Sequence, residues 1–258
     1  MTKKYPREIW EAERVSVNGW ISIGNAFSSE ILATQDYDSL CLDLQHGAFH
    51  YSEALSILQA IAPSGIFPFA RVPSLESGLI GKLLDSGARG IICPMIDTAE
   101  DAAEFVNCLQ YPPSGMRSYG PIRAKFFSES SYTSEANENI LAFAMLETER
   151  AVNNMDAILS TPGLDGIYVG PADLSISLYG GRLVPGIDRE EEDLINLFQN
   201  IAKACGNASK YSGIHCASAE YAARAAGWGF NMVTLSSDLR LLSGAASDSI
   251  SRFRQAIG

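Results

Sequence analysis

Residues 90–110, GIICPMIDTAEDAAEFVNCLQ, contain one complete strand-and-helix unit. The run GIICPM at 90–95 is almost wholly apolar, as strands buried on both faces of a sheet are. Thr98 then stands where a helix cap is expected, with acidic residues in the next turn and apolar residues at helical spacing beyond it. A strand followed directly by a helix is the repeating unit of parallel α/β folds, so this stretch indicates the fold class of the chain.

The same unit recurs along the whole chain. Helix-like segments separate the apolar runs, among them residues 51–62, 189–205 and 218–227. The eight apolar runs are WISIG at 20–24, SLCLDL at 39–44, IFPFARV at 66–72, GIICPM at 90–95, LAFAMLE at 141–147, GIYVG at 166–170, SGIHCA at 212–217 and MVTLSS at 232–237. Eight units predict a (β/α)8 TIM barrel, an α/β fold of about 250 residues.

We expect a single barrel domain over residues 1–258, because no linker or change of composition divides the chain. A doubly wound open sheet is the structural alternative. It is weakened because no GxGxxG pattern opens a helix after the first apolar run.

The composition narrows the range of partners. The chain is 47% hydrophobic and carries a formal net charge of −11, so we expect it to bind neither nucleic acid nor an anionic membrane surface. No apolar run reaches the roughly 18 residues of a membrane span, and no apolar stretch follows the charged start MTKKYPREIW as in a signal peptide. Five scattered cysteines without a CxxC pair are typical of buried thiols in a reducing compartment, so we expect a cytoplasmic protein.

Polar residues occupy the ends of several predicted strands. Asp43 lies near the end of the second apolar run and His46 just beyond it, Arg71 lies near the end of the third, Glu147 ends the fifth, and Asp173 follows the sixth. Taken singly, each has a structural explanation, such as a turn cap or an ion pair. Because the carboxyl ends of all strands meet at one face of a barrel, the five together predict an active site there.

The residue types at this face suit metal-assisted carbon–carbon chemistry. Glu147 and Asp173 lie on neighbouring predicted strands, and two carboxylates without His or Cys favour Mg²⁺ or Mn²⁺, with Co²⁺ as a further candidate. Arg71 and the metal would stabilise an enolate of a 2-oxo acid. His46, three residues after Asp43 and before a bend at Gly47, would be a general base whose tautomer the Asp43 carboxylate fixes.

The start of the helix after the sixth run is a second binding feature. Its residues read GPADLS, and the backbone amides of a helix start accept carboxylates, so Gly170, Pro171 and Ala172 are predicted to bind substrate. No Lys stands at the end of a predicted strand, which favours an aldolase that needs no Schiff base.

One connection does not fit the simple repeat. Residues 111–136 form a long segment with several cationic and aromatic residues, and loops of this length are usually functional or disordered. Arg123, within it, could bind a distal carboxylate of the substrate or could equally be a solvated surface charge. The role of the segment stays open at this point.

Six motifs in order resemble the HpcH/HpaI family of class II, metal-dependent pyruvate aldolases. They are LDLQHG, FARVP, KLLDSGARGIICPMIDTAEDA, YPPSGMRS, LETERAVNNMDAIL and LDGIYVGPADLSISLYG. The resemblance implies a (β/α)8 barrel that assembles as a hexamer and exchanges its last helix, residues 240–258 here, between subunits. It also implies a lyase that cleaves or forms 4-hydroxy-2-oxo acids, with pyruvate and an aldehyde as its small-molecule partners.

The resemblance also implies roles for single residues. The metal-binding acids of the family fall on Glu147 and Asp173, its acid–base pair on Asp43 and His46, and its enolate-stabilising arginine on Arg71. Trp20 corresponds to a tryptophan near the end of the first strand, and Asp85 resembles an aspartate that helps to line the site of a neighbouring subunit.

The chain departs from the family pattern at two positions, and other functions remain as alternatives. Met145 stands where family members often have Gln, and Ser118 where they often have Gly, which affects acceptor preference and rate more than reaction class. The alternatives are a CoA-thioester lyase of the citrate lyase β-subunit type, an oxaloacetate decarboxylase, and a non-catalytic barrel that binds 2-oxo acids. The sequence does not identify the aldehyde.

Overall fold

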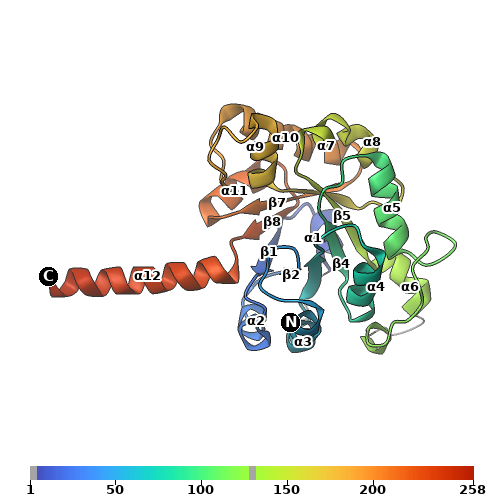
Figure 1. Cartoon of the computed structure of the whole chain (residues 1–258), viewed down its shortest axis with the longest axis horizontal. Helices are drawn as coiled ribbons and strands as arrows, with labels where there is room; N and C mark the ends of the chain where they lie inside the picture. Colours follow the sequence, from blue (N-terminus) through green and yellow to red (C-terminus); the bar gives the residue numbers. More distant parts are fainter. Residues whose placement is uncertain (1–4, 128–131) are drawn as a thin grey trace.

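Eight parallel strands close into a barrel in the computed structural model, which describes residues 5–127 and 132–258 (Figure 1). The strands are β1 (Ser16–Ile21), β2 (Ser39–Asp43), β3 (Phe67–Arg71), β4 (Gly90–Cys93), β5 (Leu141–Leu146), β6 (Gly166–Val169), β7 (Tyr211–Cys216) and β8 (Met232–Leu235). Each strand pairs with its neighbours in chain order, and β8 pairs with β1. The predicted (β/α)8 barrel is confirmed.

Helices surround the barrel and connect successive strands. They are α2 (Ala26–Ala33), α3 (Tyr51–Ile61), α4 (Ser77–Asp85), α5 (Ala99–Leu109), α7 (Glu149–Asn153), α8 (Met155–Leu159), α9 (Pro171–Tyr179), α10 (Glu192–Asn207) and α11 (Ala219–Gly227). Two short 3₁₀ helices, η1 (Ala62–Ser64) and η2 (Ala124–Phe127), lie in connections. The long segment after α5 contains η2 and leads into α6 (Tyr132–Asn139), so part of it is helical; residues 128–131 lie outside the described chain.

The first helix, α1 (Pro6–Glu11), closes the amino-terminal end of the barrel. Trp10 is 4% exposed, and its ring centre lies 4.5 Å from that of Tyr211 and 5.8 Å from that of Phe143. Its indole N–H donates to Ser16 Oγ at 2.9 Å. The apolar cluster inside the barrel therefore begins at α1 and continues towards the carboxyl ends of the strands.

Aromatic side chains fill the barrel interior beside glycines on the next strand. A Cβ atom added to Gly90 would lie 2.2 Å from the Phe69 ring, one on Gly166 2.7 Å from the Phe143 ring, and one on Gly213 2.8 Å from the Tyr168 ring. In each case the glycine and the aromatic residue are direct register partners: Phe69–Gly90, Phe143–Gly166 and Tyr168–Gly213. The three glycines leave the volume that the rings occupy.

The first strand lies earlier in the chain than the sequence predicts. We expected a strand over 20–24, but β1 spans Ser16–Ile21. Ser16 and Asn18 interrupt the apolar pattern, yet both are fully buried because they have hydrogen-bond partners inside the barrel. Trp20 consequently lies near the carboxyl end of β1.

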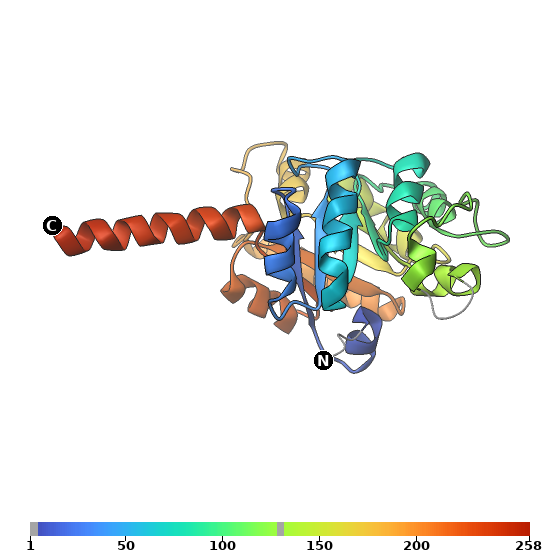
Figure 2. The same ribbon diagram turned by 90° about the horizontal axis from the view of Figure 1, so that it is seen from below.

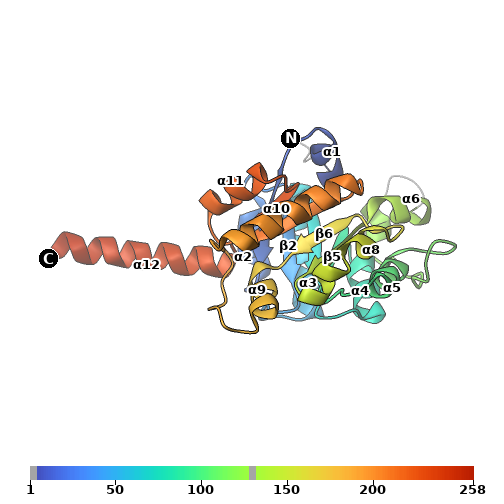
Figure 3. The ribbon, with the colours of Figure 1, turned by 90° about the horizontal axis from the view of Figure 1, so that it is seen from above.

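The last helix, α12 (Asp238–Ile257), leaves the barrel and extends away from it in all three views (Figures 1, 2 and 3). Of its residues only Asp238 is buried. Its exposed apolar side chains are Leu239, Leu241, Leu242, Ile250, Phe253 and Ile257. Within the described ranges, no helix combines the length and apolar character that a membrane span requires.

Candidate active site

Three predicted site residues meet at the carboxyl ends of β1, β2 and β3. Asp43 and Arg71 are register partners, and Arg71 donates to the Asp43 carboxylate from Nε at 2.9 Å and from Nη2 at 2.7 Å. The Trp20 indole N–H donates to the same carboxylate at 3.0 Å. The guanidinium carbon of Arg71 also lies 4.9 Å from the Trp20 ring centre. The three side chains therefore form one buried, oriented group.

The Asp43 carboxylate also accepts hydrogen bonds from the backbone of the bend that follows β2. Asp43 Oδ1 accepts from the backbone N–H of Gln45 at 3.2 Å and of His46 at 3.1 Å. The Gly47 N–H donates to the Asp43 carbonyl at 3.1 Å, and a Cβ atom on Gly47 would lie 2.2 Å from that oxygen. Only glycine fits this close approach.

The expected contact between the Asp43 carboxylate and the His46 imidazole is wrong. The carboxylate binds the His46 backbone instead, because Arg71, Trp20 and two bend amides already occupy its oxygens. The His46 side chain is exposed at the top of the bend. His46 therefore lies at the mouth of the barrel, by which we mean the end formed by the carboxyl ends of the strands, but the Asp43 carboxylate pairs with Arg71 instead of the His46 imidazole.

The charge state of Asp43 follows from these contacts. Burial raises the pKa of Asp43. The hydrogen bonds and positive charge of Arg71, together with the hydrogen bond from the Trp20 indole, lower the pKa by more than burial raises it, so it lies below the usual value. Asp43 is therefore a carboxylate at neutral pH, and it holds Arg71 in place. In the described part of the chain, Nη1 of Arg71 has no hydrogen-bond partner and is the atom left for a ligand.

Glu147 and Asp173 lie on the opposite side of the mouth, after the paired strands β5 and β6. Glu147 is 3% exposed, and its Oε1 accepts from the Met95 N–H at 2.8 Å. Burial raises the pKa of Glu147; the Met95 N–H opposes this rise, and the negative charge of Asp173 adds to it. The two carboxylates are thus close enough to repel each other.

This pair of acids fits a hard divalent ion. A Cβ atom on Gly170 would lie 3.0 Å from Glu147 Oε2, so glycine at the end of β6 keeps the approach to that oxygen open. Over residues 5–127 and 132–258, no group of three or more His, Cys, Asp or Glu side chains could hold a metal. Two carboxylates with open positions are the donor set expected for Mg²⁺ or Mn²⁺, which keep several waters.

The start of α9 lies beside these acids. Gly170 is the N-cap of α9, and the first-turn N–H groups of a helix have no intrahelical partner. Pro171 has no N–H, so it fixes the helix start but donates no hydrogen bond; the amides of Ala172 and Asp173 remain. Met145 is 2% exposed, and its Cε would lie 3.0 Å from a Cβ on Gly170, so an apolar group borders this side.

His215 is a mouth residue that the sequence analysis did not single out. It lies in β7, and its ring centre is 4.8 Å from that of Trp20. The signal was present in SGIHCA, where His215 stands near the carboxyl end of an apolar run, as Asp43 and Arg71 do in theirs.

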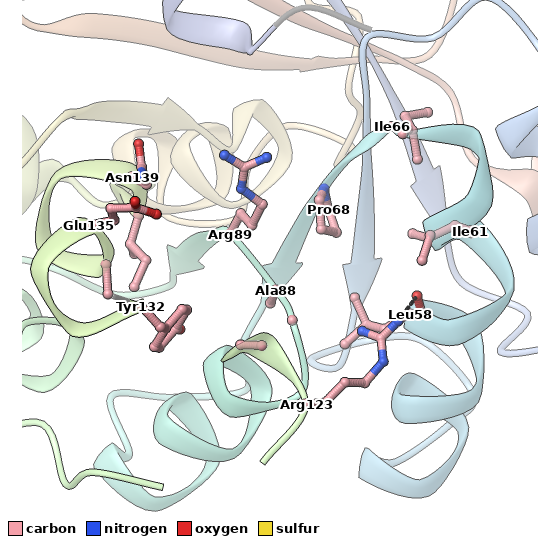
Figure 4. A pocket seen from close by; sticks show the side chains of 16 residues that line it. Leu58, Ile61, Ile66, Pro68, Ala88, Arg89, Arg123, Tyr132, Glu135 and Asn139 are labelled. Carbon is pink, nitrogen blue, oxygen red and sulfur yellow. Dashed lines mark hydrogen bonds between the residues drawn. The ribbon is translucent and has the colours of Figure 1, made fainter. Parts of the chain in front are cut away.

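Arg123 does not lie at the mouth in a single chain. It donates to the carbonyl of Ser86 at 2.6 Å. It also donates to the carbonyl of Leu58 at 3.2 Å (Figure 4). These carbonyls belong to the ends of the helices before β3 and β4, which lie at the amino-terminal end of the barrel. Arg123 borders a cavity of about 380 Å³ there, with Arg89 and Tyr132 among the lining residues (Figure 4).

Asp85, the last residue of α4, also lies away from the mouth. It accepts from Arg117 Nη2 at 2.7 Å, and both residues line a cavity of about 690 Å³ between α4 and α5. Arg117 Nε and Nη1 are buried without a hydrogen-bond partner. Within one chain, then, Asp85 and Arg117 belong to the flank of the barrel.

The closed parallel barrel gathers polar side chains at the carboxyl ends of its strands, which is where barrel enzymes have their active sites. A family profile described as HpcH/HpaI aldolase/citrate lyase matches residues 18–245, and the chain belongs to this family. The family expected from the ordered motifs is therefore confirmed.

Relatives agree with this assignment over nearly the whole chain. The hydroxypyruvate/pyruvate aldolase of Rhizorhabdus wittichii is 36% identical over 248 residues, which cover 96% of this chain and 98% of that protein. The 2-keto-3-deoxy-L-rhamnonate aldolase of Klebsiella pneumoniae is 34% identical over 242 residues, 91% of this chain and 87% of that protein. The crystal structure of an HpcH/HpaI aldolase/citrate lyase family protein from Burkholderia cenocepacia superposes with a TM-score of 0.89 at 28% identity, covering 98% and 100% of the two chains.

Proposed function

We propose that the chain is a divalent-metal-dependent aldolase that cleaves or forms 4-hydroxy-2-oxo acids from pyruvate, or a related 2-oxo acid, and an aldehyde. The observation that carries the proposal is the pairing of two features at one mouth. Arg71 is held by the buried Asp43 carboxylate on one side, and Glu147 faces Asp173 on the other. The names of the aldolase relatives support the same reaction class, a carbon–carbon lyase.

Glu147 and Asp173 would hold the metal. When bound, Mg²⁺, Mn²⁺ or Co²⁺ polarises the keto group of a 2-oxo acid and stabilises negative charge on its oxygen. The Met95 N–H fixes one oxygen of Glu147, so the other oxygen is left for the ion. The apolar Met145 beside Gly170 narrows this part of the site without adding a ligand.

The remaining residues bind the substrate and move its proton. The amides of Ala172 and Asp173 at the start of α9 bind the substrate carboxylate. Arg71 Nη1 donates to the keto oxygen, which gains charge as the enolate forms. His46 takes the proton from the C4 hydroxyl during cleavage and returns it during condensation. Asp43 is a positioning residue, because it acts through Arg71 and the bend that carries His46.

A panel of aldehydes incubated with pyruvate and Mn²⁺, with products detected by mass, tests this function. We expect at least one aldol product, its loss in EDTA, and its recovery on addition of Mg²⁺ or Mn²⁺. Full turnover in EDTA would contradict the metal assignment. Cleavage of a CoA thioester, release of CO₂ from oxaloacetate alone, or 2-oxo acid binding without any turnover would each favour one of the alternative functions.

We also propose that the chain is a cytoplasmic homo-oligomer, and specifically a hexamer with exchanged last helices. The exposed apolar side chains of α12 need a cover, and α2 exposes Phe27 and Ile31, so both surfaces are candidates for contact with a second copy. In such an assembly Asp85, paired with Arg117, would approach the mouth of a neighbouring barrel. Arg123, near the same flank, would take part only through that neighbour. All five cysteines are free, as in reducing compartments.

A further inference from the structure

His215 lies at the mouth of the barrel but has no part in the steps above. Along β7, alternate residues face the barrel interior and the surrounding helices. Ile214 and Cys216 belong to the apolar cluster between strands and helices, whereas Tyr211 packs against the interior cluster. His215 therefore points into the barrel, at the carboxyl end where the site lies.

The neighbours of His215 are parts of the proposed substrate site. Its ring meets Trp20 edge to face, at 4.8 Å between ring centres and an interplanar angle of 87°. Trp20 in turn carries the Arg71 guanidinium on its ring. The last register pair between β6 and β7 is Val169–Ile214, so His215 follows directly beside Gly170, the N-cap of α9. His215 thus borders the place where the 2-oxo acid is expected.

A chain of buried hydrogen bonds holds the His215 ring. His215 Nδ1 lies 3.1 Å from the Tyr168 hydroxyl, which lies 2.6 Å from Thr234 Oγ1. Thr234 Oγ1 accepts from Asn18 Nδ2 at 2.9 Å, and Asn18 Oδ1 accepts from Ser39 Oγ at 2.8 Å. Every proton of this chain has an acceptor when Thr234 donates to Tyr168 and Tyr168 donates to His215 Nδ1. The other ring nitrogen, Nε2, then carries the hydrogen and is left to donate at the mouth.

The imidazole is neutral at physiological pH. Burial and then the nearby positive charge of Arg71 lower the pKa of His215 to about 3, with Asp43 opposing and Arg240 adding to the shift. A neutral imidazole that is fixed through Nδ1 is a hydrogen-bond donor rather than a proton acceptor. This distinguishes His215 from His46, which is exposed.

We infer that His215 is a specificity-determining residue whose Nε2–H donates to a hydroxyl group on C3 of the 2-oxo acid, so that a 3-hydroxy-2-oxo acid is preferred to pyruvate as the nucleophilic substrate. The inference rests on the proposed function for the reaction itself. A donor in a half-buried position is left unpaired when the substrate has no hydroxyl, and such a loss discriminates strongly between substrates.

Kinetics with matched substrates test the assignment. Hydroxypyruvate and pyruvate are compared as donors, each with glycolaldehyde and with acetaldehyde, for the wild type, His215→Leu, His215→Gln and Tyr168→Phe. We expect His215→Leu to lower kcat/KM for hydroxypyruvate about tenfold more than for pyruvate with either aldehyde. The quantity compared is the ratio of kcat/KM for hydroxypyruvate to kcat/KM for pyruvate. His215→Gln, which keeps an N–H donor, should have a ratio between those of His215→Leu and the wild type. Tyr168→Phe should lower the ratio less than His215→Leu does.

Two kinetic outcomes and one binding outcome would overturn the inference. An equal loss for both donors would show that His215 only packs against Trp20, and a loss that followed the hydroxyl of the aldehyde would place the contact on the other substrate. Calorimetric titration with hydroxypyruvate and with pyruvate, in the presence of Mn²⁺, gives the ratio of the two binding affinities without turnover. If the aldolase proposal fails, both acids would bind without forming a product, and this outcome differs from a failure of the role proposed for His215. A binding ratio that is the same in the wild type and in His215→Leu would reject the role of His215.

Discussion

The Asp43 carboxylate accepts hydrogen bonds from Arg71, from the Trp20 indole and from the N–H groups of two residues in its own bend. At the scale of single residues, this explains which parts of the site could be predicted. Arg71 and Glu147 were found because they end apolar runs, and a barrel gathers strand ends at one face. The partner of Asp43 could not be predicted, because spacing along the chain favoured His46 whereas register across strands selects Arg71. Arg123 could not be placed, since no pattern fixes the path of a long segment.

Arg71→Ala should lower kcat by about 10²–10³, as the loss of one donor to a developing oxyanion does. Arg71→Lys should also be poor, because an ammonium group cannot replace the two parallel bonds to Asp43. Steady-state kinetics with pyruvate and the best aldehyde of the panel measure both variants. A near wild-type rate for Arg71→Ala would mean that the pair with Asp43 is only structural.

His46→Ala should lower aldol cleavage by about 10²–10⁴, the range for loss of a general base. Binding of pyruvate and Mn²⁺ should survive in this variant, because neither relies on His46. His50, which is exposed at the start of α3, offers a matched control, since His50→Ala should keep the cleavage rate. A near wild-type cleavage rate in His46→Ala would mean that another group transfers the proton.

Asp43→Asn should destabilise the fold, because it leaves the buried Arg71 charge without a counter-ion. The pKa of Asp43 is lowered in the folded state, so its contribution to stability is present above the unfolded-state pKa of about 3.9 and is lost as pH falls through the lower folded-state value. We expect a cost of about 3–5 kcal/mol in the free energy of unfolding. Urea unfolding at fixed protein concentration should give a constant difference between wild type and variant from pH 8 to about pH 5. A difference that closed near pH 6 would point to a different titrating group.

At the scale of elements, the apolar runs predicted the strands wherever both faces are apolar, as in β4 and β6. The prediction failed at β1, whose inward residues Ser16 and Asn18 are polar but paired inside the barrel. Such pairing is invisible in one strand, because the partners Trp10 and Thr234 come from α1 and β8. The helix in the long segment after α5 was missed for the opposite reason, since α6 is mostly polar and has little apolar periodicity.

Trp10→Ala tests the closure of the barrel by α1. Removing a large buried ring should lower the free energy of unfolding by about 3–5 kcal/mol. Because α1 lies at the end of the barrel opposite the mouth, KM for pyruvate should change little. Trp10→Phe, which keeps most of the apolar volume but loses the hydrogen bond to Ser16, is the matched control and should cost less. A large rise in KM without loss of stability would contradict the assignment of α1 to stability and of the opposite end of the barrel to substrate binding.

At the scale of the whole molecule, repetition made the barrel predictable, since eight similar units leave few other arrangements. Assembly is different. The sequence shows that α12 has apolar residues, but only the structure shows that they are not covered by the barrel of the same chain. A contact between two copies depends on the shapes of the two surfaces that meet. The sequence of one chain does not show which of its surfaces pack against each other in an assembly.

Removal of residues 245–258 tests the assembly. The shortened chain should form a smaller assembly than the full chain in light scattering at micromolar concentration, because three of the exposed apolar side chains of α12, Ile250, Phe253 and Ile257, would be lost. Its matched control is the full chain with Ser251→Ala, which changes an exposed polar position of the same helix and should leave the mass unchanged. A full-length chain that scatters as a monomer would exclude both the exchanged helix and a shared site.

The glycines that face Phe69, Phe143 and Tyr168 restrict how this barrel can evolve. At Gly90 and Gly213 the ring on the preceding strand occupies the volume that a side chain would need, so a larger residue there requires a smaller ring. At Gly166 a Cβ atom would also lie 2.2 Å from the Tyr211 carbonyl oxygen, so a smaller residue at Phe143 would not make room for it. A single substitution at Gly90 must pass through an overpacked intermediate, whereas a simultaneous reduction of Phe69 removes the clash. We therefore expect strong epistasis within the Phe69–Gly90 and Tyr168–Gly213 pairs and near-additivity between the two pairs. Among divergent barrels of this kind, the paired positions should covary between β3 and β4 and between β6 and β7, whereas the position of Gly166 should stay glycine.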